Sequence, residues 1–202
     1  MSHLRHSLPV DDRQHDERGW GPVADRDGGE RGSLRVRWVA LLAFGIGFGY
    51  VEAAVVHYLR RIIGYQAGYQ VGAHHVYLDL GVIAFVQPEH SVLVDPALTQ
   101  VEIAREAATL LMLLAVGVLA ARSLRRRVAA FFIAFAVWDL TYYLFLRVLD
   151  GWPARLTDLD VFFLIPVTWV GPVATALVAS TVVLVLASWV YLSASRAPGR
   201  RG

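Results

Sequence analysis

The chain has 202 residues, of which 56% are hydrophobic and only 18% charged, and its mean hydropathy is +0.47. Soluble domains carry about a quarter charged residues, so this composition indicates an integral membrane protein. The chain contains no cysteine and no lysine, and all 19 of its basic residues are arginine. These absences exclude disulfides, thiolate metal sites, CxxC redox motifs, lysine Schiff bases and Walker-type phosphate loops.

The first segment of the chain is polar. Residues 1–37 hold seven arginines against seven acidic residues, several glycines and no apolar periodicity. Such a segment cannot bury enough apolar surface to offset the conformational entropy that folding removes. The sequence therefore predicts a disordered cytoplasmic tail over 1–37, and a second, short cytoplasmic tail over 193–202.

Stretches apolar and long enough to cross a membrane follow at about 38–59, 99–121, 128–149 and 161–192. About 20 helical residues cross ~30 Å of hydrocarbon. The last stretch is longer than this and contains Pro166 and Pro172, so a short broken helix is expected at its start. The apolar segment 76–86 is too short to cross and is expected to be a surface or re-entrant element of an outer loop over 60–98. The predicted fold is all-α, an integral membrane four-helix bundle.

Arginine residues are concentrated on one side of these spans. That side carries Arg31, Arg35, Arg37, Arg122, Arg125, Arg126, Arg127, Arg196, Arg200 and Arg201. The other side carries only Arg60, Arg61 and Arg155, together with several acidic residues. Because arginine-rich loops stay in the cytoplasm, both termini are predicted there. The run at 125–127 is interpreted as a topology signal that contacts anionic lipids, and not as a nucleic-acid site.

Several ionisable side chains lie within the predicted spans, where each costs about 2.5–3.5 kcal/mol to insert and is a candidate functional residue. They are Glu52, His57, Glu102, Arg105, Glu106 and Asp139, with Tyr142 and Tyr143 following the last. Counted from the outer helix ends, Glu52 and Glu106 lie about 10 Å deep and Asp139 about 15 Å deep. Acidic residues from three helices are therefore expected to meet in the outer half of the bundle.

The spacing of these residues supports the convergence. Polar stripes at i, i+3, i+4 spacing are formed by Glu102, Arg105 and Glu106 in the second span and by Asp139, Tyr142 and Tyr143 in the third. In the first span, Gly45 and Gly49 share a helix face with Glu52. Such a pair of small residues predicts the close approach of another helix, which would direct Glu52 into the bundle.

One guanidinium group cannot neutralise four acids, so the others must be protonated, matched to a bound cation or reached by water. The candidate cation or proton site is Glu52, Glu102, Glu106 and Asp139, with Arg105, His57, Tyr142 and Tyr143 in supporting roles. If the cation is a divalent metal, the expected ligands are Glu52, Glu106 and Asp139. Two structural alternatives stay open. Arg105 can form an ion pair with a neighbouring glutamate, and His57 can be an interfacial hydrogen-bonding residue.

Several motifs carry a resemblance. They are WDLTYY at 138–143, GWP at 151–153, LIPVTWVGP at 164–172, YVEAA at 50–54 and EIAREAAT at 102–109. Together they resemble a family of small bacterial multi-span membrane proteins that has no known activity. The resemblance covers the four spans and implies a protein of the bacterial cytoplasmic (inner) membrane. It implies no reaction.

Three functions remain open at this level. The first is a carboxylate-rich site for a metal or another cation, the second a small transporter or proton relay, and the third a structural or partner-binding membrane subunit. No motif indicates a catalytic residue, haem, flavin or nicotinamide, so enzymatic activity is left open. The expected partners are the lipid bilayer and, because four spans are few for a transporter, further copies of this chain.

Overall fold

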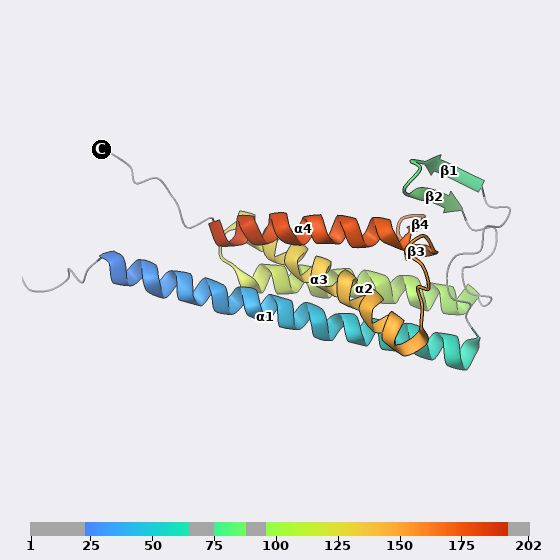
Figure 1. The fold of residues 1–202 in the computed structure, drawn as a ribbon, viewed down its shortest axis with the longest axis horizontal. Coiled ribbons are helices and arrows are strands. Elements are labelled where there is room, and N and C mark those ends of the chain that lie inside the picture. The colour runs from blue at the N-terminus through green and yellow to red at the C-terminus, as the bar shows by residue number, and fades with distance from the viewer. Residues whose placement is uncertain (1–22, 65–74, 88–95, 194–202) are drawn as a thin grey trace, which may run out of the picture.

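Figure 1 shows the computed structural model, which describes residues 23–64, 75–87 and 96–193. The long helices are α1 (Val23–Tyr58), α2 (Pro96–Ala120), α3 (Leu124–Asp150) and α4 (Val173–Ser193). A short π-helix, η1 (Leu59–Ile63), continues α1. The strands are β1 (His75–Asp79), β2 (Ala84–Gln87), β3 (Leu159–Phe163) and β4 (Thr168–Pro172). The outer parts of both predicted tails, 1–22 and 194–202, and loop residues 65–74 and 88–95 lie outside the described residues.

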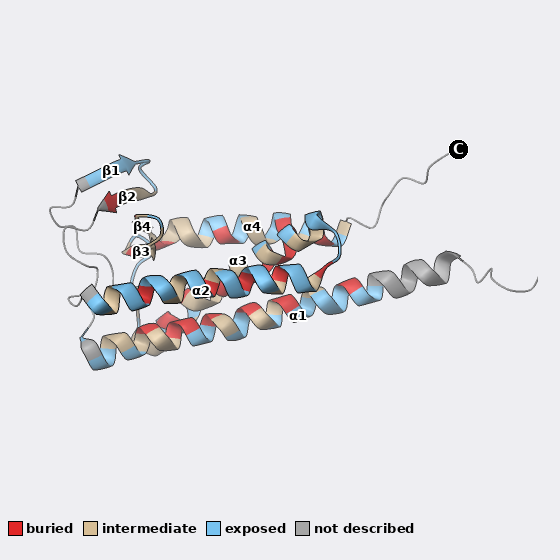
Figure 2. Cartoon of the chain, turned by 180° about the vertical axis from the view of Figure 1, so that it is seen from behind, coloured by how far each residue is buried: buried red, intermediate tan, exposed pale blue. Residues whose placement is uncertain are grey.

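All four long helices contain a stretch that is long and apolar enough to cross a membrane. These stretches are Gly32–Ile62, Ala97–Ala120, Leu124–Asp150 and Val173–Ser193. Their outward faces expose large apolar side chains, including Leu119, which is 84% exposed, and Val148, which is 72% exposed (Figure 2). Soluble proteins rarely expose apolar patches on this scale. The helices are therefore consistent with a multi-pass membrane protein.

Helix α3 is the centre of the packing, because it contacts α1, α2 and α4, whereas α1 and α4 touch each other only slightly. Small residues make this possible: Ala130 and Ala134 of α3 are fully buried and let the neighbouring helices approach. Around them the core contains Ile133 of α3, Leu113 of α2 and Tyr191 of α4, all with no exposed surface.

The two glycines of the first span place α1 directly against α3. A Cβ atom on Gly49 would lie 2.1 Å from Thr141 Oγ1, and one on Gly45 would lie 2.7 Å from Val137 Cβ. Side chains at these positions would separate the helices. The close approach predicted from the glycine spacing is confirmed, and Glu52 on the same helix face is buried.

The two ends of the molecule differ. The start of α1, the turn from α2 to α3 and the end of α4 lie at one end, which we call the far end (Figure 1). The opposite end carries η1 and the strands and is called the sheet end. The sheet end corresponds to the outer side in the sequence-based prediction.

A four-stranded antiparallel sheet with the order β1-β2-β4-β3 forms the sheet end. One hairpin, β1–β2, comes from the connection between α1 and α2, and the other, β3–β4, from the connection between α3 and α4. The hairpins join where Ala84 pairs with Val170 and Val86 with Thr168. The expectation of an all-α fold is therefore wrong for residues 75–87 and 159–172.

The fourth helix begins at Val173, and not at residue 161 as the sequence predicted. Residues Val161, Phe162 and Phe163 are β-branched or aromatic and favour a strand. Pro166 has no backbone N–H and ends the regular structure that precedes it. Apolar composition alone does not distinguish this strand pair from the first turns of a buried helix.

The first helix begins earlier than predicted. Residues 23–37 were assigned to the disordered tail, but they belong to α1. Leu34 is buried in the core cluster with Leu41 and Leu113, so apolar packing starts before residue 38. Once this turn is fixed, each further helical residue adds a hydrogen bond at little cost, which extends the helix into its charged segment.

Candidate functional site

An arginine between two glutamates connects α1 to α2. The Arg105 guanidinium of α2 donates through Nε to Glu102 Oε2, at 2.7 Å, and through a terminal nitrogen to Glu52 Oε1 of α1. Both carboxylates are buried, whereas the arginine side chain is 29% exposed. One positive charge is therefore shared between two acids. The ion pairs of Arg105 are therefore made with Glu52 and Glu102.

Within the described residues, Glu106, one turn after Glu102 on α2, is paired with backbone N–H groups and not with an arginine. Its two oxygens accept the backbone N–H groups of Leu164, at 2.9 Å, and Ile165, at 3.3 Å. These residues lie in the turn between β3 and β4. Glu106 therefore holds the second hairpin against α2, and both of its carboxylate oxygens are occupied.

Asp139 lies deepest of the acidic residues, in the middle of α3. Its Oδ2 accepts a hydrogen bond of 2.7 Å from the Ser180 hydroxyl of α4. Within the described parts of the chain, no arginine or histidine forms an ion pair with it. Asp139 thus differs from Glu52 and Glu102, which share Arg105, because it has a neutral partner only.

These acids border a cavity of about 60 Å³, which we call the deep cavity. Its lining comprises Glu52, Arg105, Glu106, Thr109, Trp138, Asp139, Tyr142, Tyr143, Phe162 and Phe163. A water molecule needs roughly 10–15 Å³ of such space, so the cavity is large enough for a few waters or one small cation. Its ionisable lining contains three carboxyl groups and one guanidinium, so its formal charge is negative.

A second cavity, of about 80 Å³, lies nearer the sheet end and is called the end cavity. Its lining comprises Val56, Leu59, Arg60, Thr99, Glu102, Arg105, Tyr142, Asp160, Val161 and Leu164. Arg105 and Tyr142 border both cavities. The ion pairs of Arg105 therefore lie at the boundary between the two spaces.

Asp160 of β3 is a buried acid that sequence reasoning did not select. Its Oδ2 accepts a hydrogen bond of 2.9 Å from the hydroxyl of Tyr143 on α3. Burial raises the pKa of the Asp160 carboxyl to about 6, although the Tyr143 hydroxyl, the Val161 N–H and the positive charge of Arg60 act in the opposite direction. This carboxyl group can exchange its proton near neutral pH.

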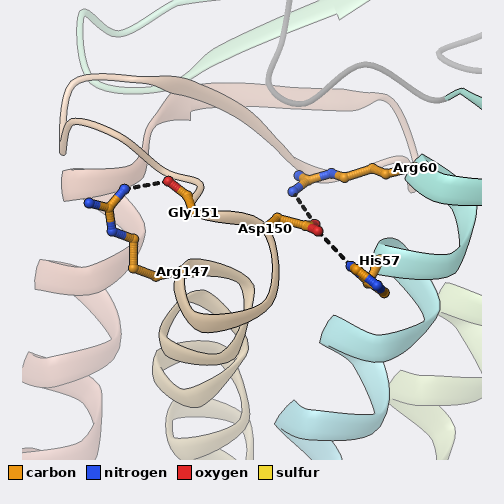
Figure 3. Close-up of polar contacts among 5 residues, drawn as sticks. All are labelled: His57, Arg60, Arg147, Asp150 and Gly151. Atoms are coloured by element: carbon orange, nitrogen blue, oxygen red, sulfur yellow. Dashed lines mark hydrogen bonds and ion pairs between the residues drawn. The ribbon is translucent and has the colours of Figure 1, made fainter.

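A further polar cluster lies at the sheet end and is drawn in Figure 3. Asp150, the last residue of α3, lies 2.5 Å from His57 Nδ1 and accepts a hydrogen bond of 2.9 Å from Arg60. The Arg60 guanidinium also lies over the Trp152 ring, 4.7 Å from its centroid. On the other side of the helix end, Arg147 donates to the Gly151 carbonyl. The cluster ties the end of α1 to the end of α3, and His57 belongs to it rather than to the deep cavity.

The structure brings together most of the residues that the sequence selected. Glu52, Glu106, Asp139, Arg105, Tyr142 and Tyr143 all border the deep cavity. Glu102 borders the end cavity instead, and His57 pairs with Asp150. The additional polar residues, Asp160 of β3, Ser180 of α4 and Arg60 of η1, were missed because each reaches the site or its neighbours only through the packing of separate elements. Sequence spacing carries no signal for such contacts.

The expected metal ligands do not form a coordination site. In residues 23–64, 75–87 and 96–193, no group of three or more histidine, aspartate or glutamate side chains is placed to hold a metal ion. Glu52 Oε1 is paired with Arg105 and both oxygens of Glu106 accept backbone N–H groups, so three of these four oxygens have other partners. The donor set of the deep cavity therefore does not fit a divalent metal.

Comparison of the chain with protein-family models, with curated proteins and with solved structures found no match. The function must therefore be argued from the cavities and their residues.

Proposed function

We propose that this chain is a multi-pass protein of the bacterial cytoplasmic membrane, with the far end in the cytoplasm. Four helices of spanning length with apolar outward faces support the membrane assignment. The turn at the far end contains Arg122 and the run at 125–127, whereas Arg60 at the sheet end is paired with Asp150. Positive charge accumulates on cytoplasmic loops, which supports this orientation. The bacterial assignment rests on the resemblance of the motifs around Asp139.

We further propose that the deep cavity binds a proton or a small monovalent cation at Asp139. The observation that carries this proposal is that Asp139 has the Ser180 hydroxyl, and no positively charged group, as its described partner. An isolated ionised carboxylate at this depth is strongly unfavourable, so the group is protonated or is matched by a cation. The lining of the same cavity includes the aromatic residues Trp138 and Tyr142, and aromatic rings attract cations at their faces.

Access is proposed from the sheet end only. Towards the far end, the space between the helices is filled by apolar residues, including Leu113, Ile133 and Ala134, all with no exposed surface. Towards the sheet end, the deep cavity shares Arg105 and Tyr142 with the end cavity. This asymmetry favours a relay or sensor that exchanges its proton or cation with the outside. It is less suited to transport across the membrane.

Infrared spectroscopy of the protein in lipid nanodiscs tests the proposal, with the aspartate carboxyl carbons labelled with ¹³C. At neutral pH the wild type should show the carbonyl stretch of a protonated aspartic acid. Asp139→Asn should remove this band, whereas Asp160→Asn should leave it in place, which separates it from any contribution of the Asp160 carboxyl group. Alternatively, addition of sodium, potassium or ammonium should change the carboxylate bands in the wild type but not in Asp139→Asn. The exposed Asp79, which accepts the Gly81 N–H, provides a matched control, because Asp79→Asn should leave both signals intact.

A wild-type spectrum with neither a protonated aspartic acid nor a response to any of the three cations would overturn the proposal. Asp139 would then be an ionised, solvated group. The polar cluster would instead be a structural device that holds the helices together.

A further inference from the structure

Asp160 and Tyr143 connect the two cavities directly. Asp160 borders the end cavity, Tyr143 borders the deep cavity, and the Tyr143 hydroxyl donates to Asp160 Oδ2 at 2.9 Å. Both side chains are buried, with residue exposures of 7% and 4%. Tyr143 lies one helical turn from Asp139, on the same face of α3. Two hydrogen-bonded exchangeable groups therefore link the end cavity to the deep cavity, which Asp139 also borders.

Arg105 cannot carry a proton between the two cavities. Arg105 borders both cavities, but a guanidinium group does not lose its proton in proteins. It can order water or a cation, and its pairing with Glu52 and Glu102 keeps it in place. A proton that passes between the cavities through a side chain must therefore use a group that both donates and accepts, such as a phenol or a carboxyl group.

We propose that Asp160 and Tyr143 form the proton path between the end cavity and Asp139. In the outward direction, the Tyr143 hydroxyl gives its proton to the Asp160 carboxylate and takes one from a water molecule in the deep cavity. That water takes its proton from the Asp139 carboxyl group. Asp139 becomes a carboxylate, Asp160 becomes a carboxylic acid, and Tyr143 and the water are unchanged. The reverse sequence loads Asp139.

The surroundings of Asp160 suit this role. The charged and titratable groups that face it are Tyr143 and Asp139 of α3, Arg60 of η1, and Glu102 and Arg105 of α2, which border the same cavity. Arg60 favours the carboxylate form, whereas burial and Asp139 favour the acid form. Because these influences oppose each other, Asp160 can both accept and release a proton near neutral pH.

The path rests on the proposed function, since it presupposes a protonated Asp139. Its test is the rate at which the Asp139 carboxyl proton exchanges for deuterium, followed from the infrared carbonyl shift after the nanodiscs are transferred to D₂O. Asp160→Asn should slow this exchange by about 10- to 100-fold, because the amide can accept the Tyr143 hydrogen bond but cannot carry the proton onward. Tyr143→Phe should slow it similarly.

The matched control is Tyr191→Phe. Tyr191 is also fully buried and its hydroxyl also donates one hydrogen bond, at 3.1 Å to the Ala120 carbonyl, but it lies at the far end. This variant should exchange at the wild-type rate. If Tyr143→Phe does not fold, Asp160→Asn alone decides, because it preserves size and hydrogen bonding.

The two proposals fail in different ways. If the Asp139 band is present and exchanges at the wild-type rate in both variants, the path is wrong while the proton site stands. Slow exchange in Tyr142→Phe, with normal rates in Asp160→Asn and Tyr143→Phe, would also overturn the path. The proton would then pass along Tyr142, which borders both cavities. If the wild type has no protonated aspartic acid, the proton site itself is wrong.

Discussion

A single buried carboxyl group, that of Asp160, should make the stability of the protein depend on pH. Its pKa is raised from 3.8 to about 6, chiefly by burial, so the folded protein holds this proton more tightly than the unfolded chain does. The group therefore favours folding below about pH 4, and this contribution is lost as the pH rises through about 6. The full difference is about 3 kcal/mol of unfolding free energy.

Thermal unfolding in detergent between about pH 4 and pH 7 measures this effect. The melting temperature of the wild type should fall over this interval, and that of Asp160→Asn should fall less, because the amide does not titrate. Parallel profiles of the two proteins would show that Asp160 is already solvated in the folded state.

The residues of the deep cavity could be predicted from the sequence, but most of their partners could not. Glu52, Glu106 and Asp139 were identified because an acidic residue within an apolar span is conspicuous at any position. Asp160 follows a polar loop, where an acidic residue is expected to be exposed. Its burial depends on the pairing of β3 with β4 and on the contact with Tyr143, which the sequence does not reveal. The sequence did not decide the partners of Arg105 either. Glu102 lies three residues before it on α2 and Glu106 directly after it, and the second observed partner, Glu52, is on another helix.

At the level of helices, the contact between α1 and α3 depends on one missing side chain. A Cβ atom on Gly49 would lie 2.1 Å from Thr141 Oγ1 and 2.8 Å from the Trp138 carbonyl oxygen. Gly49→Ala should therefore lower the free energy of unfolding by about 1–3 kcal/mol, as overpacking of a tight contact does. It should also displace Glu52, which lies one turn further along α1.

Gly47 provides the control for this substitution, because it is also helical but a Cβ atom there has nothing within 4 Å. Gly47→Ala should be neutral or slightly stabilising, since alanine favours a helix over glycine by about 1 kcal/mol. Melting temperatures of the two variants in the same detergent make the comparison. Equal melting temperatures of the two variants would mean that α1 and α3 can move apart at Gly49 without loss of stability.

Among the elements, the helices were predicted well and the strands were not. A membrane-spanning helix is indicated by a local property, about 20 apolar residues in sequence. The strands at 159–163 and 168–172 also contain apolar residues, and they are strands because they pair with each other and, through β4, with β2, far away in the chain. The start of α1 was missed for a similar reason, because Leu34 is fixed by core residues of α2 and α3.

For the whole molecule, the proposed orientation can be tested with single cysteines, because the chain contains none. Ser123→Cys lies in the turn at the far end, and Thr157→Cys in the exposed connection at the sheet end. In intact cells, a maleimide that does not cross membranes should label Thr157→Cys only. Ser123→Cys should react after the membrane is permeabilised. The reverse pattern would place the sheet end in the cytoplasm and contradict the positive-inside assignment.

The depth of the proton or cation site that we propose at Asp139 would couple its occupancy to membrane voltage. It lies eleven residues from the end of α3 at Asp150, about 16 Å into a hydrocarbon layer of ~30 Å. A positive charge that moves from outside to this depth crosses at most about half of the transmembrane field, worth about 1 kcal/mol at 100 mV. An inside-negative potential would then raise the apparent affinity of the site by about five- to sevenfold, at about 1.4 kcal/mol per factor of ten. An energised cell would therefore load Asp139 at an external cation or proton concentration that leaves it empty in a depolarised one.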